Sequence, residues 1–313
     1  MDKKFLMGVG DWLTRSNAAV DKSTYVSPRL RKNLIMAAIS RSYDFYSNFF
    51  EIPVTNIDFE KLAAEYERHY LQAISLGMFA VGGIREKDHL NFWCLSQLFS
   101  PEVYVESGVF IGSSLHAFIN SPAIKKIFAI DPNLSKLRIP RESIPGAELI
   151  DSKDFSQIDF TLSGMKSLVY FDDHIDTARR IIQASEKGFR YLLFDDSTGL
   201  EGICQRLYPA IPTIPMIMNA DILNPGDELA WTFGSSSING VRGFAKNIIR
   251  GKSNMAATRL NLSISQELIE ECFEAKKLIK KYRVISNLGE FIPPQYPERM
   301  VDTSKYLVEL HQR

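Results

Sequence analysis

The stretch from Pro101 to Asp131 constrains the fold of this chain more than any other. It reads PEVYVESGVFIGSSLHAFINSPAIKKIFAID. A β-branched and aromatic run is followed by a turn with two glycines, a segment of helical apolar spacing, and a second apolar run that ends in an acid. The pattern predicts a strand, a turn, a helix and a second strand. In a parallel sheet, this unit brings the turn and the acid together at the carboxyl ends of neighbouring strands, where open α/β sheets bind ligands.

The residues of this turn are suited to holding a ligand. Gly108 and Gly112 have no side chains, so the backbone can approach a ligand closely there. Asp131 could accept hydrogen bonds from two neighbouring ribose hydroxyls, and Glu106 would end the first strand beside the same ligand. The spacing E-x-G-x-x-x-G differs from the G-x-G-x-x-G dinucleotide fingerprint. A tight strand-to-helix turn without a ligand is the alternative interpretation.

Further apolar runs extend the α/β pattern beyond Asp131. They predict strands at 147–150, 167–171 and 191–194. Between the last two, helical periodicity over 176–187 stops at Gly188. Alternating strands and helices of this length predict a Rossmann-like, doubly wound, mostly parallel sheet, which we expect to have seven strands. Asp154 follows the strand at 147–150 and is a further candidate for cofactor binding.

The segments before and after this α/β pattern are expected to have other structures. We expect a helical N-terminal region (1–85), a Rossmann-like domain (86–250), and a C-terminal helix and tail (251–313). The other expected elements are helices from 29, over 62–76, over 89–99 with Asp88 as cap, and over 265–282, and strands at 229–233 and 241–248. The proline-rich segment 209–225 is a lid, a dimer contact or an irregular path to a strand. From 288 onward we expect extended chain and then a brief helix.

Charge and cysteine usage narrow the class of protein. Lys plus Arg and Asp plus Glu both number 37, so the net charge is zero and gives no support for a nucleic-acid partner. The three cysteines are far apart and form no metal-binding spacing, which favours reduced thiols. We find no signal peptide and no apolar run as long as a membrane span. We therefore expect a cytoplasmic protein that acts on a small molecule, with 209–225 as a candidate homo-oligomer contact.

A second group of polar residues follows two successive predicted strands. Asp172, Asp173 and His174 follow 167–171, and an Asp195-Asp196 pair follows 191–194. If these strands are neighbours, the carboxylates converge and repel one another unless a hard divalent cation such as Mg²⁺ takes them as oxygen ligands. Such a metal could hold two adjacent substrate hydroxyls and lower the pKa of one. The alternative is that these acids cap the following helices.

Two histidines are expected near this group. His174 is a candidate general base, or a neutral histidine that is hydrogen-bonded to a carboxylate. His116 follows the glycines, and exposure on the helix surface is its simpler interpretation. Lys153 is another conceivable base. The chain contains no Ser-His-Asp order and no nucleophile elbow.

Four of these segments together resemble a known family. VESGVFIGSSL (105–115) and FAID (128–131) resemble the first two motifs of class I S-adenosylmethionine-dependent methyltransferases, and are most similar to the cation-dependent O-methyltransferases of the catechol and caffeoyl-coenzyme A type. YFDDH and LLFDDS resemble the strand ends from which that family takes its metal ligands. The resemblance implies Mg²⁺ or another divalent cation at Asp173, Asp195 and Asp196. It also implies contacts to the methyl donor from Glu106, Gly108, Ser114 and Asp131.

The resemblance covers about 101–197 and has departures. The second cluster is Asp-Asp where the family has Asp-Asn, and Ile175 and Asp176 occupy the place of its catalytic lysine, so His174, beside Asp173, becomes the candidate base. The segments are also similar to a cephalosporin-hydroxylase-like group. We expect metal-assisted transfer of a methyl group from S-adenosylmethionine to a hydroxyl of a natural product, sugar or phenol. The alternatives are a hydroxylase-like tailoring enzyme of the same fold and a non-catalytic ligand-binding protein.

Overall fold

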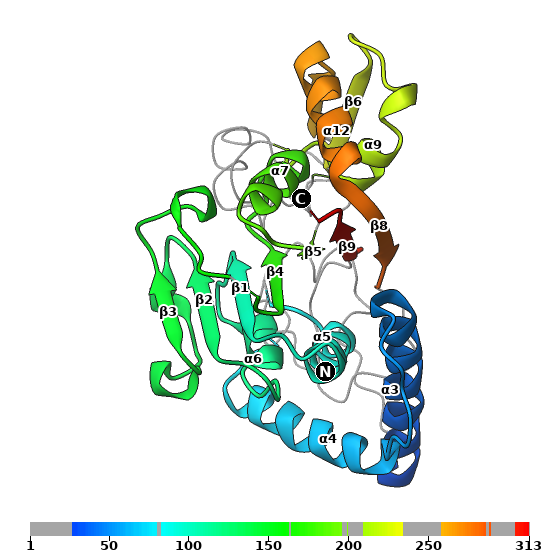
Figure 1. Ribbon diagram of the computed structural model, residues 1–313, viewed down its shortest axis with the longest axis vertical. Helices are drawn as coiled ribbons and strands as arrows, with labels where there is room; N and C mark the ends of the chain where they lie inside the picture. The colour runs from blue at the N-terminus through cyan, green and yellow to red at the C-terminus, as the bar shows by residue number, and fades with distance from the viewer. Residues whose placement is uncertain are drawn as a thin grey trace. The chain divides into compact units, whose positions relative to one another are not determined.

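The computed structural model describes residues 27–79, 83–162, 164–195, 199, 209–233, 258–285, 288 and 304–312. Its main sheet has seven strands in the order β3-β2-β1-β4-β5-β9-β8, and β6 and β7 form a separate two-stranded sheet (Figure 1). The described residues divide into two compact units. One holds those between 27 and 170 with 285 and 288, and the other holds those from 171 to 284 and from 304 to 312.

Among the described residues of the first unit, three helices precede the sheet. Helix α3 (Pro28–Phe50) begins where expected, because the Ser27 side chain accepts the Leu30 N–H. Helix α4 (Phe59–Ser75) is capped in the same way by Asp58. Helix α5 (Glu86–Leu98) starts earlier than the sequence predicts.

The expected cap of α5 at Asp88 is wrong. Arg85 occupies the N-cap position and makes no side-chain capping bond. Glu86 is therefore in the first turn, where it is buried and forms an ion pair with Arg31 of α3. Because this pair stabilises the first turn from outside the helix, the local cap signal at Asp88 does not decide where the helix begins.

The first unit contains the strand-turn-helix-strand pattern that the sequence predicts. Strands β1 (Val103–Ser107), β2 (Lys126–Ile130) and β3 (Ala147–Ile150) pair in parallel in that order. The short helix α6 (Ser113–Phe118) connects the first two, and the remaining elements are the 3₁₀ turns η1 (Leu134–Lys136), η2 (Arg141–Ser143) and η3 (Phe155–Gln157). The residues of β1 are all buried, as expected for a parallel strand covered on both faces.

Aromatic side chains form much of the core of this unit. Tyr46, Tyr66 and Tyr70 are at most 1% exposed, so the aromatic residues of α3 and α4 pack inside the unit. Helix α5 contacts α3, α4 and α6 (Figure 1).

Strand β4 (Ser167–Phe171) ends at the boundary between the two units. Helix α7 (Thr177–Glu186) and strand β5 (Tyr191–Phe194) follow in the second unit, and all three elements are at the predicted positions. The later elements are α9 (Ile214–Met218), η4 (Ala220–Ile222), β6 (Glu228–Phe233), β7 (Thr258–Ser263), α12 (Gln266–Leu278), β8 (Ile279–Val284) and β9 (Tyr306–Leu310). Strand β9 is antiparallel to both β5 and β8.

Two C-terminal expectations are wrong. The helix predicted over 265–282 ends at Leu278, and the following residues form β8 because they pair with β9. After Leu288, the described residues 304–312 contain β9, a fully buried strand, where a brief helix was expected. The predicted strand at 241–248 lies outside the described residues.

The proline-rich segment 209–225 packs within the second unit. Ala210, Ile211, Ile214 and Ile217 are buried, and α9 contacts α12 and α7. Of its expected interpretations, the irregular path to the next strand agrees best with this burial.

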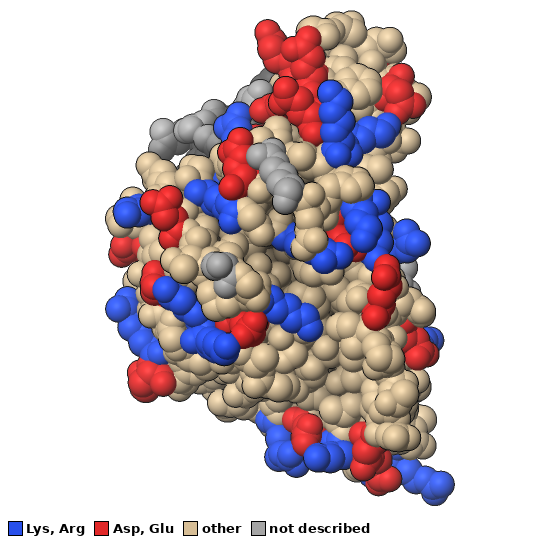
Figure 2. Space-filling view, in the orientation of Figure 1, with Lys and Arg blue, Asp and Glu red and all other residues tan. Residues whose placement is uncertain are grey.

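The predicted fold class is confirmed: the protein is an α/β protein with a Rossmann-like, mostly parallel seven-stranded sheet. The sheet order reverses at β1, which lies between β2 and β4, so the loop after β1 is at a topological switch point. The three-part division at 85 and 250 stays a prediction. On the face drawn in Figure 2, basic and acidic side chains are interspersed, without an extended field of one sign. Among the described helices, none combines the length and the apolarity needed to cross a bilayer.

Candidate functional site

The loop between β1 and α6 has a backbone that requires glycine at two positions. Gly108 and Gly112 have φ values of 92° and 84°, in the left-handed region that L side chains rarely adopt. A Cβ at Gly112 would also lie 2.6 Å from Leu137 Cδ1. The glycines of the motif therefore set the course of this loop.

Asp131 follows β2 and points at this loop, as the sequence predicts. Its Oδ2 accepts the backbone N–H groups of Val109 at 3.0 Å and Phe110 at 2.7 Å, and its Oδ1 accepts that of Asn133 at 2.7 Å. A carboxylate offers about four acceptor positions. One position on Oδ1 is thus left for a ligand, and a second ligand hydroxyl would have to replace one of the backbone donors.

Glu106 and Ser114 are satisfied by each other inside the unit. Ser114 Oγ donates to Glu106 Oε1 at 2.6 Å, and Tyr104 Oη donates to Glu106 Oε2 at 2.7 Å. Burial raises the pKa of the Glu106 carboxyl to about 8, against the opposing effect of these hydrogen bonds. Both residues therefore hold the start of α6 against β1, and the prediction that they contact a methyl donor stays a prediction.

Asp154 has a local structural role. Its side chain accepts the Ser156 N–H at 3.0 Å, and the Gln157 side chain accepts the Asp154 N–H at 2.9 Å, which completes a capping box at η3. Its predicted part in cofactor binding stays a prediction.

The two acidic clusters of the second unit follow neighbouring strands. The Asp195 N–H donates to the Phe171 carbonyl at 3.1 Å, so the ends of β4 and β5 are adjacent, as expected. Asp173 and Asp195 each face a buried cationic side chain of the same unit. Arg180 Nη2 lies 2.6 Å from Asp173 Oδ2, and Lys305 Nζ lies 3.0 Å from Asp195 Oδ1.

These pairs bear on the predicted magnesium site. A divalent cation was expected because unpaired carboxylates repel, but Arg180 and Lys305, which are 1% and 3% exposed, already neutralise the two described carboxylates. Asp173 and Asp195 therefore do not fit a magnesium site in this arrangement. Asp196 lies outside the described residues, so the three-residue ligand set stays a prediction.

His174 lies beside Asp172 in the loop after β4. Its Nε2 is 3.6 Å from Asp172 Oδ1, and its side chain is 14% exposed. Its φ of 53° is in the left-handed region, which is uncommon for a residue other than glycine. His174 is thus held in a defined orientation next to a carboxylate, as a positioned general base would be. Its predicted part in catalysis stays a prediction.

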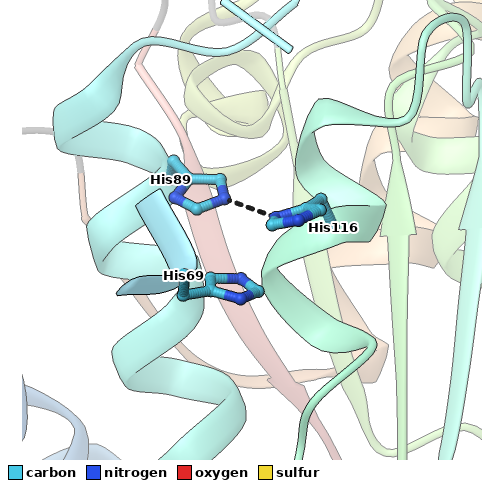
Figure 3. Close-up of side chains that lie close together, drawn as sticks. All are labelled: His69, His89 and His116. Atoms are coloured by element: carbon cyan, nitrogen blue, oxygen red, sulfur yellow. Dashed lines mark hydrogen bonds between the residues drawn. The ribbon is translucent and has the colours of Figure 1, made fainter. Parts of the chain in front are cut away.

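The structure also brings together three histidines that the sequence does not group. His69 of α4, His89 of α5 and His116 of α6 are all buried, with ligand nitrogens within 4.8 Å of one another (Figure 3). His116 is therefore not exposed on the helix surface, contrary to its simpler interpretation. No short spacing links these residues; the only sequence signal is that His69 continues the apolar stripe of Tyr66 and Ala73.

Comparisons with known proteins give matches in structure only. No protein-family profile matches the chain, and no curated protein matches it in sequence. The chain is similar to cmcI with Mg and SAM at 20% identity and a TM-score of 0.26, over 38% of this chain and 54% of cmcI. It thus spans little more than half of the length of cmcI.

Two other similar structures are matched over most of their length. An O-methyltransferase from Bacillus cereus in complex with SAH has 10% identity and a TM-score of 0.34, over 86% of this chain and 97% of that one. The O-methyltransferase TomG from Streptomyces achromogenes in complex with SAM has 12% identity and a TM-score of 0.31, over 99% and 100%.

Proposed function

We propose that this chain is an S-adenosylmethionine-dependent methyltransferase that acts on a hydroxyl group of a small molecule. One observation carries the proposal: the acid that ends β2, Asp131, is bound to the backbone of the glycine loop that follows β1. This contact joins two neighbouring strand ends at the switch point of the sheet, where a nucleoside with a free ribose could bind.

Asp131 and the glycine loop offer a donor molecule specific contacts. The remaining acceptor position of Asp131 suits a ribose hydroxyl, and the left-handed backbone at Gly108 leaves the loop open to close approach. The hydrogen bond between Ser114 and Glu106 holds the start of α6 against β1, at the two ends of the loop. Their part in the proposed function is positioning.

The proposed reaction is a direct displacement. An oxygen lone pair of the acceptor forms a bond to the methyl carbon while the carbon–sulfur bond breaks and its electrons go to sulfur. The acceptor hydroxyl proton goes to a base, for which we propose His174, oriented by Asp172. The products are a methyl ether, S-adenosylhomocysteine and a proton. Most of the rate gain would come from holding the reacting atoms in line.

The proposed reaction contains no metal-dependent step, because Asp173 and Asp195 already face Arg180 and Lys305. Magnesium assistance stays a prediction that activity assays can test directly. If Mg²⁺ assists, Asp173→Asn loses turnover and keeps donor binding, and added Mg²⁺ raises the rate of the wild-type protein.

The same ion pairs favour a second candidate function, a ligand-binding protein without catalytic activity. Carboxylates that are neutralised within the chain stabilise the fold without serving chemistry. Product mass separates all the candidates once an acceptor is found: a methyltransferase adds one methylene, a hydroxylase-like enzyme adds one oxygen, and a binding protein leaves the mass unchanged.

Calorimetric titration with S-adenosylmethionine tests the proposal. Wild-type protein should bind with one site, and Asp131→Ala should weaken binding by about tenfold or more, which corresponds to about 1.4 kcal/mol. Asp151→Ala is the matched control, because Asp151 ends the neighbouring strand β3 and is exposed. Absence of binding by the wild-type protein, with and without Mg²⁺, would contradict the proposal.

A further inference from the structure

The three buried histidines form a compact cluster within the first unit. His89 Nε2 lies 3.2 Å from His116 Nδ1, and the His69 ring stacks on the His116 ring with centroids 4.2 Å apart (Figure 3). The rings come from three different helices, α4, α5 and α6. Their exposed fractions are 6% for His69 and 0% for the other two.

Half of the ring nitrogens in this cluster have no hydrogen-bond partner among the described residues. His69 Nε2, His89 Nδ1 and His116 Nε2 are buried and unpartnered among the residues that the structure describes. Of the six ring nitrogens, His89 Nε2 and His116 Nδ1 face each other, and His69 Nδ1 lies 3.3 Å from Asn120 Nδ2; the His69 ring is also close to the His116 backbone. Buried polar atoms are normally hydrogen-bonded, so this concentration of unpartnered nitrogens calls for a ligand.

We infer that His69, His89 and His116 bind one divalent transition-metal ion, with Zn²⁺ as the best match. Zinc takes three histidine nitrogens at about 2.0–2.1 Å in a tetrahedral arrangement, which sets adjacent nitrogens about 3.3–3.4 Å apart. The separation of 3.2 Å between His89 Nε2 and His116 Nδ1 is close to that value. Metal binding would draw in the third nitrogen, which lies within 4.8 Å of the others.

The chemistry of the cluster selects the class of metal. All of its ligands are imidazole nitrogens, which suit zinc, copper, nickel and cobalt, whereas magnesium and calcium prefer oxygen ligands. Burial lowers the pKa of His69 to about 4 and of His116 to about 3, so both rings are neutral at pH 7 and keep a lone pair for a metal.

The surroundings supply an outer contact and an entry path. A metal-bound histidine usually donates its other ring N–H to an acceptor, and Asn120 can accept from His69 Nδ1 once its amide turns to present Oδ1 in place of Nδ2, which lies 3.3 Å away. A pocket of about 320 Å³ reaches His69 and is also lined by Arg68, Trp93 and Asn120. This pocket is a route by which a metal ion can reach the His69 ring.

The competing interpretation is that the three rings are core packing. His69 and His89 lie among aromatic side chains such as Tyr66 and Phe79, and near-parallel rings 4.2–5.4 Å apart pack as aromatic groups do. Packing alone gives His69 Nε2 no partner, whereas a metal held by His89 Nε2 and His116 Nδ1 would take it as the third ligand.

The first test is equilibrium metal binding by the tag-free full-length chain after removal of metal with a chelator. Titration with Zn²⁺ against a chromophoric chelator should give one tight equivalent. Co²⁺ should give the visible absorption bands of a tetrahedral ion, and X-ray absorption of the zinc form should show three imidazole nitrogens at about 2.0–2.1 Å. Mg²⁺ should not compete.

Single substitutions test which residues bind the zinc ion. His69→Gln, His89→Gln and His116→Gln should each lower zinc affinity by about 100-fold or more, since even the loss of an outer partner costs about 10–100-fold. Asn120→Ala should lower zinc affinity by about 10–100-fold, because Asn120 is an outer partner of the site. His311→Gln is the matched control because His311 is exposed in the second unit, and it should bind zinc as the wild-type protein does.

Circular dichroism of each metal-free variant shows whether it is folded. If a glutamine variant unfolds, the cobalt spectrum and the X-ray absorption of the wild-type protein still show whether three imidazole nitrogens bind the metal. The inference is overturned if the wild-type chain binds no stoichiometric Zn²⁺ or Co²⁺, or if folded His69→Gln and His116→Gln retain wild-type affinity.

Discussion

The acidic clusters after β4 and β5 and the histidine cluster of α4, α5 and α6 differ in how the chain satisfies them. Asp173 and Asp195 have buried cationic partners in Arg180 and Lys305. The three histidines leave buried nitrogens unpartnered. Residue types alone therefore favour a metal at the carboxylates, whereas the partners that the fold provides favour a metal at the histidines. Glu106 is an intermediate case, because a proton rather than a cation neutralises it.

The largest expected effect tests the ion pair at Asp173. Arg180→Ala leaves a buried carboxylate without its cation, so we expect the free energy of unfolding to fall by about 3–5 kcal/mol. Arg179→Ala is the matched control, since the Arg179 side chain is 57% exposed and its pair with Asp176 is on the surface. It should cost at most about 1 kcal/mol in the same urea titration. Equal losses in the two variants would contradict the buried pair.

The next effect concerns the histidine cluster. Free Zn²⁺ at 100 times its dissociation constant should raise the free energy of unfolding by about 2.7 kcal/mol, because only the folded chain presents the three nitrogens together. Differential scanning calorimetry measures this as a higher Tm. His116→Gln should abolish the shift, and a shift that persists in that variant would place the zinc elsewhere.

The next effect concerns Glu106 and is smaller when it is expressed per pH unit. Its folded-state pKa of about 8 is above its ordinary value of 4.5, so the folded chain holds a proton that the unfolded chain has released between those pH values. Stability should therefore fall as pH rises through this window, by at most about 1.4 kcal/mol per pH unit. Denaturation of wild-type and Glu106→Gln proteins between pH 5 and pH 8 measures this. The glutamine variant should lose the Glu106 part of the slope, and an unchanged slope would show that Glu106 is ionised when folded.

The smallest expected effect is that of Mg²⁺ on stability. Because Asp173 and Asp195 are already paired with Arg180 and Lys305, we expect no binding of Mg²⁺ there. Millimolar Mg²⁺ should therefore leave the Tm of the wild-type protein unchanged. A saturable rise in Tm that Asp173→Asn removes would instead establish the magnesium site that the sequence predicts.

The sequence predicts the central strands well. Strands β4 and β5 have the predicted bounds, because short apolar runs in a covered sheet are limited by prolines, glycines and acids. The direction of Asp131 toward the glycine loop also follows from the predicted topology.

Other features depend on long-range contacts. Strand β8 continues a helical pattern and becomes a strand because β9 pairs with it. Lys305 is 110 positions from its partner Asp195, so no local sequence pattern predicts this ion pair. The histidine cluster likewise forms only when α4, α5 and α6 pack together.

The central claim is that the loop between β1 and α6 binds S-adenosylmethionine, and hydrogen exchange of the backbone amides tests it most directly. Saturating S-adenosylmethionine should slow exchange in peptides that cover the loop from Gly108 to Gly112 and the Asp131 turn, and Asp131→Ala should remove this protection. Identical exchange of these peptides with and without S-adenosylmethionine would contradict the account.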